Sequence, residues 1–186
     1  MNWLVHEAAR SLLGGGVIAY PTEAVFGLGC DPLDVNAVLR ILICKQRSLD
    51  QGLILVASAF DQLEPYLAIP DKKTKNKLLA SWPGPVTWLV PVQPWVPYWL
   101  TGKYDTLAVR ISGHPLVQQL CEAFGGAIVS TSANIHGRRA ARSALMVHRV
   151  FGNKIDYILN GETGKLASVS EIRDARSDRI VRPASR

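Results

Sequence analysis

Lys45 and Arg47 form a pair whose residue types suit a chemical task. Lysine supplies a mobile point charge and arginine a planar fork of donors, a combination that suits the oxygens of a polyphosphate. Both lie at the end of an expected helix, however, and the dipole of a helix by itself favours cations at that end. The pair therefore predicts either a phosphate site or an ordinary helix end.

A run of hydroxyl and amide side chains, Ser130-Thr131-Ser132-Ala133-Asn134, follows an expected buried strand without a break. Ligands of α/β proteins bind in the crevice at the carboxyl ends of strands, so we expect this run to form a loop at a ligand site. The same letters also suit a turn or a helix cap, because Ser and Asn bond to nearby backbone. Together with Lys45 and Arg47, the loop predicts a site for the phosphates of a nucleotide.

Two further groups lie on or after expected strands. In the strand 106–111, Thr106, Ala108 and Arg110 share one face, since residues two apart point the same way. A buried arginine is costly without a partner, so Arg110 must meet a carboxylate of the protein or an anionic ligand. Thr22 and Glu23 follow the strand 17–20; they suit a polar substrate, a base or a metal partner, or simply a turn that begins at Pro21.

Several other chemistries find no support. The stretch 161–165 resembles part of a P-loop, but its first glycine is misplaced and Lys165 is followed by leucine. The four histidines lack metal-ligand spacing, and no G-x-S-x-G nucleophile motif occurs. Cys30, Cys44 and Cys121 are widely spaced and odd in number, which favours a reducing compartment over a zinc site.

Apolar periodicity predicts the elements that must position these groups. Helices are expected at 2–13, 34–45 (with Asp34 as N-cap), 71–80, 115–124 and 143–151. Strands are expected at 17–20, 53–57, 86–92, 106–111, 127–130 and 157–159, and a hairpin at 170–182. Continuous apolar strands are typical of sheets covered on both faces. We therefore expect an α/β fold: one domain, 1–186, with a single twisted mixed β-sheet and flanking helices.

Composition limits the class of protein. The chain has 186 residues, and its 21 Lys+Arg against 15 Asp+Glu give a net charge of +6, which suits an anionic partner. Two basic clusters, 72–77 and 138–142, are either solvated faces or contacts with a nucleic-acid backbone. With no basic leader before an apolar run and no stretch of about 20 apolar residues, we expect a cytoplasmic protein that does not enter a membrane.

Taken together, the motifs resemble one family, the YrdC-like threonylcarbamoyl-adenylate synthases of the TsaC type, in its short bacterial form. The similar segments run in family order from VIAYPTEAVFGLGCDP (17–32) and KQRSLDQGLILVA (45–57) through WPGPVTWLVP (82–91), TLAVRISGHPLV (106–117) and STSAN (130–134) to NGETG (160–164) and SEIRD (170–174). They cover nearly the whole chain. One departure is Ser48, where the family usually has proline.

The resemblance implies an activity. Such enzymes join L-threonine, bicarbonate or CO2, and ATP with Mg²⁺, and release pyrophosphate and threonylcarbamoyl-AMP. Other tRNA threonylcarbamoylation enzymes then modify the adenosine beside the anticodon, so these enzymes are implied as transient partners. No prosthetic group or protein-bound metal is implied. The implied fold is a twisted α/β sheet that encloses a basic cavity.

Site residues carry over position by position. The family motif implies that Lys45, Arg47, Ser132 and Asn134 are the catalytic residues and hold ATP, with Thr106 and Arg182 as further ATP contacts. Threonine contacts are implied at Thr22, Arg110, Ser130 and Ser170. The alternative is an RNA-binding YrdC-like protein that acts in ribosome, rRNA or tRNA maturation and contacts the RNA backbone directly.

Overall fold

The computed structural model describes residues 2–166 and 168–184; the expected domain, 1–186, also includes four residues that lie outside this description. Its helices are α1 (Trp3–Leu13), α2 (Val35–Lys45), α3 (Lys72–Ala80), α4 (Tyr98–Thr101), α5 (Pro115–Phe124) and α6 (Ala144–Phe151). Its strands are β1 (Ile18–Pro21), β2 (Phe26–Gly29), β3 (Ile54–Ala57), β4 (Val86–Pro91), β5 (Thr106–Ile111), β6 (Ile128–Ser132), β7 (Tyr157–Ile158), β8 (Glu171–Asp174) and β9 (Ile180–Arg182). Among these residues no helix is long and apolar enough to cross a membrane.

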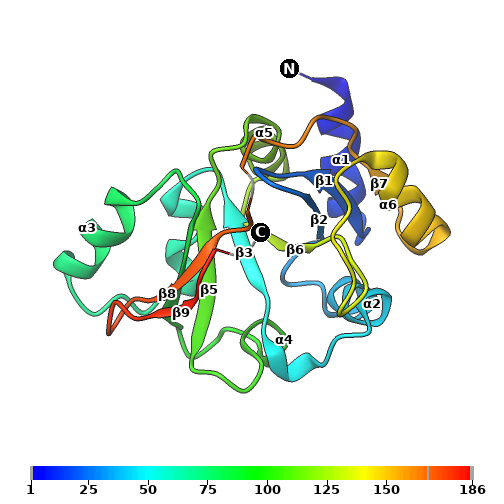
Figure 1. Cartoon of the computed structure of the whole chain (residues 1–186). Coiled ribbons are helices and arrows are strands. Elements are labelled where there is room, and N and C mark those ends of the chain that lie inside the picture. The colour runs from blue at the N-terminus through cyan, green and yellow to red at the C-terminus, as the bar shows by residue number, and fades with distance from the viewer. Residues whose placement is uncertain (1, 167, 185–186) are drawn as a thin grey trace.

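In the described part of the chain, nine strands form one mixed sheet in the order β7-β1-β2-β6-β3-β5-β4-β8-β9. The pairs β3–β5, β4–β8 and β1–β7 are parallel, and the other neighbouring pairs are antiparallel. Figure 1 shows α3 and the β8–β9 hairpin at one end of the molecule and α6 at the other. The expected α/β class, the mixed sheet and the C-terminal hairpin are confirmed.

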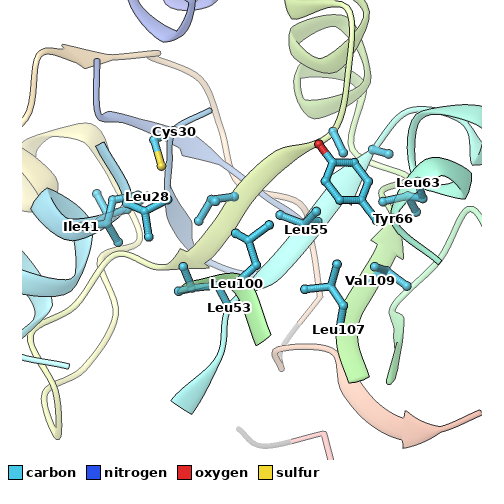
Figure 2. Close-up of a cluster of buried hydrophobic side chains, with 14 of the residues drawn as sticks. Leu28, Cys30, Ile41, Leu53, Leu55, Leu63, Tyr66, Leu100, Leu107 and Val109 are labelled. Atoms are coloured by element: carbon cyan, nitrogen blue, oxygen red, sulfur yellow. The ribbon is translucent and has the colours of Figure 1, made fainter. Parts of the chain in front are cut away.

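Two apolar cores cover the two faces of the sheet, because side chains alternate along each strand. On one face, α1 and α5 pack side by side (Figure 1) against Ile18, Val56 and Ile128. On the other face, buried residues of α2, α3 and α6 join those of the central strands. Figure 2 labels part of this second core: Leu28, Cys30, Ile41, Leu53, Leu55, Leu63, Tyr66, Leu100, Leu107 and Val109.

The helix that ends at Lys45 starts where the sequence predicts. The Asp34 carboxylate accepts hydrogen bonds from the backbone N–H groups of Asn36 and Ala37, so the first turn of α2 is capped. Its apolar stripe then packs into the core through Val38, Ile41 and Leu42. The cap and the stripe together fix the rotation of α2, and this rotation buries Lys45.

Strand β2 is the main element that sequence patterning does not predict. Gly27 and Gly29 interrupt its apolar pattern, and both approach the ring of Tyr20 on β1: a Cβ at Gly27 would be tight, at 3.3–3.4 Å from its neighbours, and at Gly29 only glycine fits. A Cβ at Gly29 would lie 2.5 Å from the Val129 carbonyl oxygen and 2.7 Å from Cε1 of Tyr20. The missing side chains thus let three strands pack around the buried tyrosine ring.

Gly29→Ala should therefore destabilise the fold by about 1–3 kcal/mol, the usual range for overpacking a tight site. Equilibrium urea unfolding measures this difference. Gly126→Ala is the matched control, because a Cβ there meets nothing closer than 3.8 Å, in a ring edge of Phe124. Equal stability of the two variants would contradict the packing argument.

Candidate active site

A cavity of about 340 Å³ opens on the central strands. Its floor follows one row of the sheet, in which Ser130 of β6 pairs with Ile54 of β3, Ile54 with Ala108 of β5, and Ala108 with Leu89 of β4. Residues in register across neighbouring strands point to the same face. The floor thus includes the small-residue face of β5 expected from the sequence, with Thr106 at one end and Arg110 at the other.

Most of the expected site residues surround this cavity. Eight of them line it, namely Thr22, Arg47, Thr106, Arg110, Ser130, Ser132, Ser170 and Arg182. These residues come from segments far apart in the sequence, and the sheet register brings them together. The other two, Lys45 and Asn134, lie behind the end of β6 and are not part of the lining.

The hydroxyl run after Val129 differs from the loop that the sequence predicts. Strand β6 continues through Ser132, because Thr131 pairs with Leu28 and Ser132 with Gly27. These partners belong to β2, the strand that the sequence pattern did not reveal. The tertiary pairing therefore holds Ser130 and Ser132 in an extended backbone, with both residues in the cavity wall.

Arg110 meets a carboxylate of the protein, one of the two alternatives open from the sequence. Its Nη1 lies 2.8 Å from Oε2 of Glu23, and both side chains are largely buried. Oε1 of Glu23 accepts hydrogen bonds from the Ser112 hydroxyl at 2.7 Å and from the Gly113 N–H at 3.1 Å. Burial opposes ionisation of Glu23, but Arg110 and Ser112 outweigh it and lower the pKa of the carboxyl. Arg110 and Glu23 therefore form a fixed ion pair on the cavity wall.

Arg47 and Arg182 lack such a counter-charge: within the described residues neither has a salt-bridge partner. Nη2 of Arg47 donates to the Gly52 carbonyl at 2.9 Å, and its buried Nε has no partner. Nη2 of Arg182 donates to the Ser170 carbonyl at 3.0 Å. Burial, with a further contribution from Arg182, lowers the pKa of Arg47. Two neighbouring guanidinium groups without an anion favour a negatively charged ligand.

Lys45 is tied to the end of β6 rather than to the end of its own helix. Its buried Nζ donates to the Ser132 carbonyl, to the Asn134 carbonyl at 2.9 Å and to Oδ1 of Asn134 at 3.2 Å. The Ser132 hydroxyl donates to the same Oδ1 at 2.6 Å. Burial, and secondarily the charge of Arg47, lower the pKa of Lys45 to about 8. Lys45 and Asn134 thus set the position of the chain that follows the strand.

The remaining expected residues are hydroxyls at the rim and wall. The Thr22 hydroxyl donates to the Val25 carbonyl at 2.7 Å and closes the turn between β1 and β2. The Ser170 and Thr87 hydroxyls lie 2.8 Å apart. Ser48, which replaces the usual proline, accepts a hydrogen bond from the Asp50 N–H and begins a short 3-10 turn, so this departure leaves an ordered local structure.

Sequence reasoning missed the apolar side of the cavity. Leu53, Leu100 and the half-exposed Tyr104 line it together with Pro85. For Leu100 the available signal was the aromatic, proline-rich stretch 95–100, but this stretch has no periodicity that indicates which residues face a ligand. The stretch 161–165, which partly resembles a P-loop, packs against residues of the cavity wall. The Gly164 N–H donates to the Thr22 carbonyl, and a Cβ at Gly164 would lie 2.6 Å from the Glu23 carbonyl oxygen.

Metal-ligating side chains and the two basic clusters contribute little to the candidate site. Within residues 2–166 and 168–184 no group of three or more His, Cys, Asp or Glu side chains could hold a metal ion. In the basic cluster 72–77, Lys75 pairs with Glu64 and Lys77 with Asp178, so half of its lysines are neutralised. The cluster at 138–142 lies on a surface loop.

Known proteins share this architecture. A 55% identical relative, named threonylcarbamoyl-AMP synthase, from Nitrosococcus oceani aligns over 97% of this chain and 98% of its own length. A relative of the same name from Stutzerimonas stutzeri is 48% identical over 98% of both chains. Among solved structures, P. abyssi Sua5 complexed with L-threonine superposes with a TM-score of 0.91 at 35% identity. The match covers 98% of this chain but 54% of that one, so the chain spans about half of Sua5.

E. coli YciO superposes with a TM-score of 0.85 at 26% identity, over 97% of this chain and 89% of YciO. The family model for Sua5, YciO and YrdC, which carries the description "Telomere recombination", matches residues 10–184. The full-length identity and the shared fold agree with the family expected from the motifs. The chain belongs to the Sua5–YciO–YrdC family.

Proposed function

We propose that this protein is an L-threonylcarbamoyladenylate synthase, which joins L-threonine, bicarbonate or CO2, and ATP and releases pyrophosphate. The observation that carries the proposal is the contrast between two sets of arginines on the wall of one cavity. Arg47 and Arg182 have no carboxylate partner among the described residues, which suits phosphates, whereas Arg110 is paired with Glu23, which suits an amino acid. Relatives named threonylcarbamoyl-AMP synthase, at up to 55% identity, support the same reading.

In this proposal, the guanidinium of Arg110 binds the threonine carboxylate, and Thr22, Ser130 and Ser170 surround the rest of the amino acid. The threonine ammonium loses a proton to solvent, and the neutral amine then captures CO2 and releases a second proton to solvent, which gives a carbamate. A carbamate oxygen then attacks the α-phosphorus of ATP, and pyrophosphate leaves. The protein contributes orientation and charge stabilisation, and no side chain acts as a nucleophile.

Arg47 and Arg182 stabilise the negative charge that builds up on the phosphates, and the apolar side of the cavity receives the base. Thr106 and Ser132 add hydroxyl groups to the wall of the cavity. In this proposal Mg²⁺ enters together with ATP, as the MgATP substrate. We place the reaction in the cytoplasm, and its product passes to the enzymes that modify tRNA.

Lys45 and Asn134 contribute in a different way from Arg47. They hold the end of β6 and the loop after it, in which Nδ2 of Asn134 donates to the Arg138 carbonyl at 2.8 Å. The ammonium of Lys45 also adds positive charge behind Ser132. Replacing either residue changes both the charge and the local backbone, so Arg47 offers the cleaner test of phosphate binding.

The direct test is pyrophosphate release from ATP in the presence of threonine and bicarbonate. We expect release that requires all three substrates, and a product with the mass of threonylcarbamoyl-AMP. Release that does not depend on threonine would refute the proposal. An RNA-binding role instead predicts an affinity for RNA that falls steeply with salt.

Arg47→Met should lower turnover by about 100-fold or more, because it removes a charged donor from the developing negative charge. Arg149→Met, at an exposed position on α6, removes the same charge outside the cavity and should leave turnover unchanged. Initial rates of pyrophosphate release at saturating substrates provide the comparison. Full activity of Arg47→Met would show that the phosphates bind elsewhere.

MgATP binding should take up protons at alkaline pH. Lys45, with a pKa of about 8, is largely neutral in the free protein at pH 9, and the nearby phosphates favour its charged form. Calorimetry in buffers of different ionisation enthalpy should show an uptake of about one proton per site at pH 9. The number of protons taken up should decrease at lower pH and be small at pH values under 7, because Lys45 is then already charged in the free protein. Lys45→Met should abolish the uptake, and its persistence in this variant would assign the proton to another group.

A further inference from the structure

The cavity contains a single acidic side chain. Among the described residues that line it, the charged groups are Arg47, Arg110, Arg182 and Glu23. Glu23 contacts Arg110 at 2.8 Å, and the other two arginines have no carboxylate partner in the described chain. The formal charge is therefore about zero at the Arg110–Glu23 pair and positive at Arg47 and Arg182.

Glu23 is fixed in its place by contacts from several segments. The Ser112 hydroxyl and the Gly113 N–H donate hydrogen bonds to one carboxylate oxygen, while the other lies 2.8 Å from Nη1 of Arg110 in a charge contact without hydrogen-bond geometry. The backbone carbonyl of Glu23 accepts the Leu166 N–H at 3.1 Å. The carboxylate cannot turn away from Arg110 without leaving these donors unpaired in a buried place, which is costly.

The pairing of Arg110 with Glu23 matters because both Arg110 and the unpaired arginines must bind negatively charged groups of the substrates. A free arginine attracts any anion, and a phosphate with two or more charges is attracted more strongly than a carboxylate. An arginine already paired with a carboxylate has lost most of that unselective attraction. Its remaining donors can still form directed hydrogen bonds to a ligand of zero net charge, such as an amino-acid zwitterion.

We propose that Glu23 is a specificity-determining residue that keeps phosphate groups and inorganic dianions such as sulfate from binding to Arg110. By neutralising Arg110, it reserves this guanidinium for the carboxylate of an amino acid and leaves the polyphosphate to Arg47 and Arg182. The identity of that amino acid as threonine rests on the proposed function. The exclusion of anions rests on the ion pair alone.

The test uses Glu23→Gln, which keeps the shape of the side chain and removes its charge. Inorganic sulfate is the probe, because it is a small dianion that does not interfere with pyrophosphate assays. Rates are measured against threonine at saturating ATP and constant ionic strength. We expect the inhibition constant of sulfate, competitive with threonine, to fall at least about tenfold in Glu23→Gln relative to the unchanged protein.

Two control variants test whether the gain in sulfate inhibition comes from the lost charge of Glu23. Glu23→Asp keeps the charge and should restore resistance to sulfate to within about twofold. Glu122→Gln removes one negative charge from an exposed position on α5, outside the cavity, and should match the unchanged protein. An equal gain in sulfate inhibition in Glu122→Gln would make the effect one of net charge and overturn the proposal.

Thermal unfolding provides a second readout that needs no turnover. Sulfate should raise the melting temperature of Glu23→Gln more than that of the unchanged protein, and threonine should compete with this effect. Equal shifts in both proteins would overturn the proposal. If the unchanged protein releases no threonine-dependent pyrophosphate, the proposed function fails, yet a sulfate site gained only in Glu23→Gln would still support the exclusion of anions.

Discussion

The ion pair between Arg110 and Glu23 joins the two halves of the sheet. Glu23 belongs to the turn between β1 and β2, whereas Arg110 lies on β5, three strands away from β2 in the sheet order. A buried guanidinium needs a counter-charge, so this contact fixes where the turn lies relative to the central strands. The shape of the cavity depends on it, because both residues are part of the wall.

The buried amine of Lys45 makes a second, comparable connection. It joins the last residue of α2 to the end of β6, and thereby sets the distance between Arg47 and the hydroxyl of Ser132. In each of these two contacts, a charged side chain holds a backbone segment that would otherwise be free to shift. Preorganisation of this kind allows donors to stabilise charge in a reaction without moving first.

Those parts of the fold and of the candidate site that depend on local interactions could be predicted from the sequence. The Asp34 cap and the apolar stripe of α2 place Lys45 at a helix end, and the alternation along β5 places Thr106 on the face of Arg110. By contrast, β2 is not predicted, because its glycines are required by contacts with the ring of Tyr20 and with the backbone of Val129, which no periodic pattern reveals. For the same reason the extension of β6 to Ser132 was read as a loop, since only its pairing with β2 makes it a strand.

The sequence by itself determined the mixed α/β class and, through its motifs, the family and the set of polar residues to examine. Only the tertiary structure decided how these residues divide: Arg110 is neutralised by Glu23, whereas Arg47 lies near Arg182 with no described counter-ion. It also placed Lys45 and Asn134 behind the wall. The physical reason is that pairing and burial depend on strand register between segments up to about a hundred residues apart, which no local pattern encodes.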